Sequence, residues 1–246
     1  MFKGRQEIRE AYRNQAVAAD YIDTRFREPL GALLHARQIA CVREAIERIR
    51  PTSVLELAPG PARLTTDLVS HLPTQTVLLD GSDQMLEVAG QRLRAVSSRS
   101  WTRVRGDAFK LPFSPHFDLV YTFRLIRHFE REDRCALYRE IAKVLRPRGG
   151  LIFDAINAAV YSRLPVDVEA RKYFDAALTE DELRTELEQC GFTDVVLMPV
   201  QRRFPVLRRV QILVAPRSRA LARSAMEIVD RSGGQPLEWV VVCRRP

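Results

Sequence analysis

The sequence predicts an α/β fold, a mostly parallel sheet with helices on both faces. Two observations support this prediction. Between residues 53 and 155, short apolar runs of strand length alternate with amphipathic helical patterns, which is typical of parallel strands joined by helices. Two further strand-like runs occur near the C-terminus. We therefore expect a seven-stranded sheet that ends in an antiparallel edge strand.

Composition indicates one globular domain. The chain has 246 residues, of which 46% are hydrophobic and 28% charged, enough to build a core without disulfides or a structural metal. Its four cysteines are far apart and include no CxxC pair, which favours buried thiols. No apolar stretch approaches the ~20 residues of a membrane-spanning helix. We expect a cytoplasmic protein with no membrane partner.

The elements follow in order along the chain. Residues 5–35 are expected to form one or two irregular helices, and residues 36–50 an amphipathic helix that Pro51 ends. The central strands are predicted at 53–57, 76–80, 101–105, 117–123 and 150–155. The helices between them are predicted at 63–71, 83–94 and 131–145.

The last third of the sequence changes character. Thr179 and Glu182 have the spacing of a capping box at the start of a helix that Gly191 closes. Strands are expected at 194–200 and 237–244. Between them lies a basic insertion, about 205–233, with a helix expected near 217–230.

A turn of small residues follows the first strand, between Leu57 and Arg63. Small residues let the backbone approach a ligand closely, and the next helix N-terminus aims amide N–H groups at it. Such ligands lie beyond the carboxyl ends of the strands. Because alanine disfavours positive φ, only Gly60 is expected to adopt the most constrained conformation.

The next two strand ends also carry polar groups. Asp80 ends the second strand, 24 residues after Glu56, where a carboxylate can accept both ribose hydroxyls of an adenosine. Ser82 is expected to cap the following helix, on which Met85 offers an apolar surface. A Gly-Asp-Ala-Phe segment beginning at Gly106 follows the third strand.

In this order, these features resemble the motifs of the class I S-adenosylmethionine-dependent methyltransferases. Ala58, Gly60 and Ala62 stand where that family usually has three glycines. The segment 80–86 resembles its second motif, and 144–150 resembles its LRPGG turn with one residue inserted or substituted. The resemblance implies a Rossmann-like fold and S-adenosylmethionine as the cofactor.

The resemblance also implies the cofactor-binding residues, among which Asp107 would accept a hydrogen bond from the adenine amino group. In this family the N-terminal segment, here carrying Tyr12, often folds over the cofactor as a lid. No metal-ligand pattern occurs, so no metal is expected. The expected cofactor contacts are Tyr21, Arg25, Glu56, Ala58, Gly60, Asp80, Gly81, Met85, Asp107, Ala108, Phe109 and Thr122.

His128 is the leading candidate for a general base, because it follows the fourth strand at the rim where an acceptor should sit. A role in orienting the loop by hydrogen bonding is the open alternative. His35 is a weaker candidate, and His71 and His116 fall in expected surface loops. A base is optional here, since transfer from a sulfonium depends mainly on alignment.

The domain prediction is a single methyltransferase domain. It has a helical lid over 1–35, a core over 36–200 and 234–246, and an acceptor cap over 205–233. Arginines alternate with apolar residues in this cap, which favours a lid over the active-site mouth rather than a nucleic-acid platform. We expect a small-molecule acceptor, whose identity and reacting atom stay open, as does the oligomeric state.

Three other functions compete with this one. A nicotinamide-dependent oxidoreductase needs a GxGxxG turn, but Arg63 replaces its third glycine. An RNA or DNA methyltransferase would suit the net charge of +8, although no nucleic-acid-binding module is visible. A non-catalytic protein that binds the cofactor is the third alternative.

Overall fold

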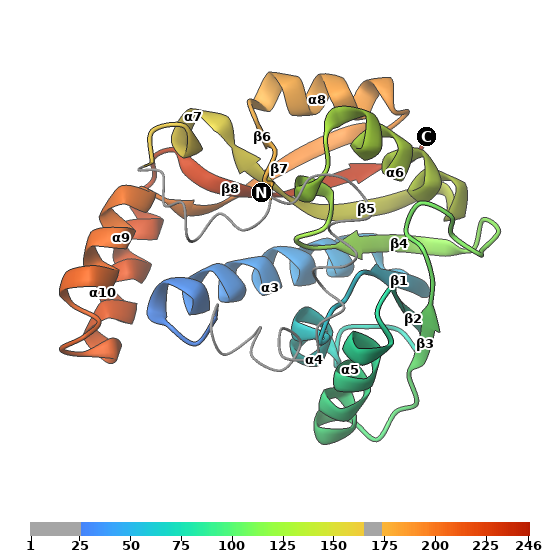
Figure 1. The fold of residues 1–246 in the computed structure, drawn as a ribbon, viewed down its shortest axis with the longest axis horizontal. Helices are drawn as coiled ribbons and strands as arrows, with labels where there is room; N and C mark the ends of the chain where they lie inside the picture. The colour runs from blue at the N-terminus through green and yellow to red at the C-terminus, as the bar shows by residue number, and fades with distance from the viewer. Residues whose placement is uncertain (1–25, 165–173) are drawn as a thin grey trace.

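The computed structural model describes residues 26–164 and 174–246 (Figure 1). Their sheet has the strand order β3-β2-β1-β4-β5-β8-β7, with the short β6 paired to β5. All pairings are parallel except those of β8, which runs antiparallel to both β5 and β7. The predicted fold class is therefore confirmed, with two corrections: β6 adds an eighth strand, and the antiparallel strand β8 lies between β5 and β7 instead of at the edge. The strands are β1 Ser53–Leu57, β2 Gln75–Asp80, β3 Thr102–Arg105, β4 Phe117–Thr122, β5 Leu145–Asn157, β6 Ala177–Leu178, β7 Thr193–Arg202 and β8 Pro236–Arg244.

Helices cover both faces of the sheet (Figure 1). Helices α3 (Pro29–Ile49) and α4 (Arg63–Leu68) pack on one face with α5 (Asp83–Val96). Helices α6 (Arg131–Val144) and α8 (Glu180–Gln189) pack on the other. The short η1 (Ile126–His128) follows β4, and α7 (Ala158–Tyr161) follows β5.

Local signals explain most helix ends. Ser82 caps α5 by accepting from the Met85 amide, and Thr179 and Glu182 form the predicted capping box of α8. Helix α3 begins at Pro29, earlier than predicted, because proline is well suited to the first helical position. None of the helices in the described residues is both long and apolar enough to cross a membrane.

Strand β5 begins earlier than predicted. It starts at Leu145 instead of Gly150 and so includes the arginine-rich run that resembled a turn. Phe117 pairs with Leu145 and Leu119 pairs with Gly150, so the register with β4 shifts between these two positions. The extra β5 residues are accommodated in this bulge.

The insertion before β8 contains two helices, α9 (Phe204–Leu213) and α10 (Arg219–Arg231). The sequence predicted α10 but not α9. Pro205 suggests a break in the chain, yet it lies in the first turn of α9, where its missing N–H costs nothing. Both helices pack against the N-terminal half of α3 through Leu33, Leu207 and Met226 (Figure 1, left).

Candidate cofactor site and active site

The strand order places the candidate site. It reverses between β1 and β4, since β2 and β3 continue from β1 in one direction while β5, β8 and β7 continue from β4 in the other. Ligands of open α/β sheets bind at the carboxyl ends of strands at such a point. The small-residue turn follows β1 there, and η1 with His128 follows β4.

The turn after β1 has an unusual backbone. Ala58, Gly60 and Ala62 all adopt left-handed conformations, with φ values of 53°, 54° and 54°. The expectation that only Gly60 would do so was wrong. The Ala58 amide donates to the Leu79 carbonyl at 2.7 Å, and the Ala62 amide donates to the Pro59 carbonyl at 3.0 Å. These bonds hold two alanines in a conformation that costs each roughly 1–2 kcal/mol.

Asp80 is joined to this turn. Its carboxylate accepts from the Gly60 amide at 3.0 Å and from the Ser82 amide at 2.9 Å. Burial raises the pKa of Asp80 to about 6, although hydrogen bonds from the Ser82, Gly60 and Gly81 amides act in the opposite direction. A carboxylate offers about four acceptor positions, so Asp80 still has acceptor capacity for a ligand hydroxyl.

The third strand brings its predicted residues to the same edge. The Gly106 amide donates to the Asp80 carbonyl at 3.0 Å, and Asp107 is exposed. The Phe109 amide donates to the Asp107 carboxylate at 2.9 Å, while the Phe109 ring packs edge-on against Phe129 at 5.0 Å between centroids. Ala108, next to Phe109, is half-buried.

Met85 and Gly81 complete this cluster. The Met85 sulfur lies 4.0 Å from where a β-carbon on Gly60 would stand, and a β-carbon on Gly81 would lie 3.7 Å from the Gly106 carbonyl. Gly60, Asp80, Gly81, Met85 and the loop after β3 are thus brought together. Tyr21, Arg25 and Tyr12 lie outside the described residues.

Glu56 has a different environment. Its buried carboxylate accepts a hydrogen bond from the Thr65 hydroxyl of α4 and also contacts Tyr121. Burial raises the pKa of Glu56 to about 8, while Tyr121 and Arg63 act in the opposite direction. Glu56 therefore connects β1 to α4 and β4 beneath the turn.

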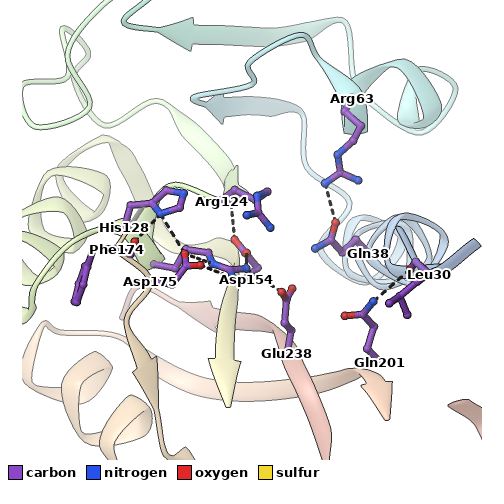
Figure 2. A network of polar contacts seen from close by, with 11 residues as sticks. Leu30, Gln38, Arg63, Arg124, His128, Asp154, Phe174, Asp175, Gln201 and Glu238 are labelled. Carbon is purple, nitrogen blue, oxygen red and sulfur yellow. Dashed lines mark hydrogen bonds and ion pairs between the residues drawn. The ribbon is translucent and has the colours of Figure 1, made fainter. Parts of the chain in front are cut away.

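His128 is 1% exposed and lies in η1. Its Nδ1 is 2.8 Å from the Phe174 carbonyl and 3.2 Å from the Asp175 carboxylate (Figure 2). A carbonyl can only accept, so Nδ1 carries the proton and Nε2 is the basic nitrogen of the neutral ring. Thr122, at the end of β4, is 1% exposed, and its hydroxyl has no hydrogen-bond partner among the described residues.

A buried charged cluster that was not expected from the sequence lies beside His128. Arg127 is 6% exposed and contacts Asp154 at 3.1 Å, Asp175 at 2.9 Å and Glu238 at 2.9 Å. Figure 2 labels these three carboxylates. Burial alone would lower the pKa of Arg127, but the three carboxylates raise it well above its ordinary value. Two carboxylates within largely apolar strands, Asp154 in β5 and Glu238 in β8, are the sequence signal that could have indicated this cluster.

The other histidines lie elsewhere. His35, in α3, contacts Asp67 at 2.5 Å and the Arg63 guanidinium of α4. Burial and the neighbouring Arg63 lower its pKa, which Asp67 partly offsets. His71 and His116 are exposed, as expected. Within the described residues, no three His, Cys, Asp or Glu side chains are grouped as metal ligands.

Comparison with known proteins identifies the domain. Residues 54–149 match a family described as "Methyltransferase domain". These residues therefore form a methyltransferase domain, and its order of motifs resembles that of the class I S-adenosylmethionine-dependent methyltransferases. The match covers the turn after β1, Asp80, the loop after β3 and η1, so it includes most of the predicted cofactor site.

One curated relative is demethylmenaquinone methyltransferase from Lactococcus lactis, 32% identical over 103 residues. The match spans 41% of this chain and 40% of the relative's length.

Two solved structures share the fold. Magnesium protoporphyrin IX methyltransferase from Synechocystis, with bound SAH, superposes with a TM-score of 0.63 at 14% identity, covering 97% of this chain and 98% of that one. Human N-acetylserotonin methyltransferase, in complex with SAM, also gives a TM-score of 0.63, at 13% identity, covering 99% of this chain and 60% of that one. Both likenesses concern the fold alone.

Proposed function

We propose that this methyltransferase transfers the methyl group of S-adenosylmethionine to a small-molecule acceptor in the cytoplasm. The observation that carries the proposal is the bond between the Gly60 amide and Asp80. It sets a left-handed small-residue turn and an acceptor-rich carboxylate side by side at the switch point of the sheet. An adenosine needs these two features, one for close backbone approach and one for its ribose hydroxyls.

The residues present fit this cofactor. Asp80 would accept from the ribose hydroxyls, Asp107 from the adenine amino group, and Ala108 and Met85 would flank the adenine ring. Thr122 would contact the cofactor from the end of β4. When bound, the cofactor supplies an activated methyl group on a sulfonium.

The chain's own task is then alignment and water exclusion, which can contribute ~7–11 kcal/mol to lowering a barrier. His128 would remove the acceptor's proton through Nε2. The Phe174 carbonyl fixes the tautomer that this role needs, and Asp175 would stabilise the charged ring. A positioning role for His128 uses the same contacts, so turnover has to separate the two roles.

Two observations support a small acceptor and a cytoplasmic location. The curated relative and one structural neighbour act on small molecules according to their names, demethylmenaquinone and magnesium protoporphyrin IX. The four cysteines are all free thiols, as is usual in a reducing compartment. We also propose that the segments 1–35 and 205–233 border the acceptor.

Calorimetry with S-adenosylhomocysteine tests the cofactor site. Asp80→Ala should weaken binding by about 1.5–3 kcal/mol, the range for hydrogen bonds to a charged group. Asp83→Ala is the matched control, because Asp83 lies in the first turn of the next helix and pairs with Arg105 at 2.9 Å. The proposal would be refuted if the protein bound NAD and not S-adenosylhomocysteine. Equal affinity for S-adenosylhomocysteine in the wild-type protein, Asp80→Ala and Asp83→Ala would refute it as well.

Label transfer identifies the acceptor class. The protein is incubated with methyl-labelled cofactor and either a small-molecule extract or total RNA. Label in the small-molecule fraction, lost in Asp80→Ala, is the expected result. Label in RNA would assign the chain to nucleic-acid methylation instead, and transfer to neither would favour a cofactor-binding protein without this activity.

A further inference from the structure

The exposed apolar side chains are concentrated in the insertion. Among the described residues, seven large hydrophobic side chains are strongly exposed, and two of these, Val96 and Val196, lie elsewhere. The remaining five are on α9 and α10, with exposed fractions from 39% to 71%. They are Val206, Ile212, Leu213, Leu221 and Ile228.

Helical spacing places these residues opposite the packed side. In α9, Leu207 is buried against α3, while Ile212 and Leu213 are more than half exposed. In α10, Met226 is buried, while Leu221 and Ile228 are seven residues apart and so lie on one stripe of the helix. Each helix therefore has an inner apolar side that packs on α3 and an outer side that carries further aliphatic residues.

The same segment holds most of the excess positive charge. Residues 203–233 contain seven arginines and two acidic residues, a net charge of +5, whereas the whole chain carries +8. The arginines are Arg203, Arg208, Arg209, Arg217, Arg219, Arg223 and Arg231.

The two acidic residues of this segment both pair with Arg37 of α3, and Glu227 also pairs with Arg231 at 3.5 Å. Asp230 accepts from Arg37 of α3 at 2.6 Å, and Glu227 accepts from the same guanidinium at 2.9 Å. No ion pair within the described ranges involves Arg209 or Arg223. The outer surface thus combines aliphatic side chains with Arg209 and Arg223, which have no ion-pair partner among the described residues, whereas Arg219 pairs with Glu28 and Arg231 with Glu227.

We propose that α9 and α10 bind this methyltransferase to an anionic membrane surface. Helices that lie in the interface of a bilayer bury aliphatic residues among the acyl chains while flanking cations contact acidic headgroups. Arginine suits this arrangement because its stem can lie along apolar surface while its guanidinium reaches the phosphates. The expectation of no membrane partner rested on the lack of a spanning segment, whereas this surface would lie on the membrane without crossing it.

A nucleic-acid surface fits these residues less well. Single-stranded nucleic acids stack on aromatic side chains, but all five exposed apolar residues are aliphatic. Aliphatic groups between the arginines gain nothing from contact with phosphates, whereas a bilayer removes them from water.

Vesicle flotation tests the electrostatic part. The protein should bind vesicles of phosphatidylcholine mixed with phosphatidylglycerol, bind phosphatidylcholine alone much more weakly, and dissociate at high salt. Each surface arginine contributes about 1 kcal/mol near an anionic bilayer, so Arg209→Gln/Arg223→Gln should lower the partition coefficient by about 25-fold. The control Arg48→Gln/Arg94→Gln removes two exposed arginines elsewhere and should change it little.

The apolar part needs a second pair of variants. Ile212→Ser/Ile228→Ser should lower the partition coefficient at least tenfold, while Val96→Ser/Val196→Ser should leave it nearly unchanged. Thermal unfolding verifies that each protein is folded. Equal binding to both kinds of vesicle, or equal loss in test and control variants, would overturn the proposal. Failure to bind vesicles, together with RNA binding or dimer formation that the same variants abolish, would assign the surface to that partner instead.

Discussion

The backbone N–H of Gly60 donates to Oδ2 of Asp80 at 3.0 Å, so the ends of β1 and β2 form one unit. The loop glycine and the strand-end carboxylate are 20 residues apart in sequence. Each constrains the other, because a shift of the turn would leave a buried carboxylate short of a donor. The geometry that would receive the ribose is therefore set before any ligand binds.

We expect cofactor affinity to depend on the protonation of Asp80. Burial raises its pKa to about 6, and ribose hydroxyls donate to the ionised form. The association constant for S-adenosylhomocysteine should be flat above about pH 7 and fall by up to tenfold per unit below about pH 6. Calorimetry across this range measures it. A flat profile in the wild-type protein, matching that of Asp80→Asn, would contradict the expectation.

Ala58→Gly should stabilise the protein. Glycine adopts the left-handed conformation of Ala58 without the roughly 1–2 kcal/mol that alanine incurs there. The greater conformational entropy of glycine in the unfolded chain offsets part of this gain. A gain of about 1 kcal/mol corresponds to a Tm rise of about 2–4 °C. Ala225→Gly, in the middle of α10, is the matched control and should lower stability by about 1 kcal/mol. A lower Tm for both variants would contradict the prediction.

Glu56 should make folding stability depend on pH. Burial raises its folded-state pKa to about 8, above the value near 4.3 of an unfolded chain. The folded state then holds a proton that the unfolded state has released, so stability is greatest below about pH 4 and is lost as pH rises to about 8. Denaturant titrations should show a smaller decline between about pH 6 and 8 in Glu56→Gln. Parallel pH profiles would show that Glu56 is already ionised.

His128 is tested by turnover once an acceptor is known. His128→Ala should lower kcat by ~10²–10⁴ with little change in affinity for S-adenosylhomocysteine. Asp175→Asn should lower kcat less, because the Phe174 carbonyl still fixes the tautomer. Wild-type turnover in His128→Ala would leave the histidine a purely structural role.

The clustering of the candidate site residues could be predicted largely from sequence because its signals are local. A small-residue turn, a strand-end Asp80 and a loop containing Asp107 are each recognisable within a few residues, and their order along the chain relates them. The parallel sheet then brings the three strand ends to one edge. The left-handed φ of Ala58 and Ala62 could not be read in this way, because it is imposed by bonds to Leu79 and Pro59 against the preference of alanine.

The cluster around Arg127 was missed for the opposite reason. Glu238 is 111 residues from Arg127 in sequence, and nothing local relates them. Only the insertion of β8 between β5 and β7 brings Glu238 beside Asp154. Helix α9 was missed because no capping side chain marks its start, where Arg203 makes no side-chain cap hydrogen bond.

Helix α3 has two adjacent residues with different neighbours. Arg37 pairs with Glu227 and Asp230 of α10, while Gln38 accepts from Arg63, which directly follows the small-residue turn, at 2.7 Å (Figure 2). The insertion and the helix that follows the turn thus both bind to α3. Replacing α9 and α10 by a segment from another enzyme would remove the apolar contacts of Leu33 and the ion pairs of Arg37. The smallest transferable module is therefore the insertion together with α3. A graft of α9 and α10 without α3 would separate the proposed membrane-binding surface from the helix on which it packs.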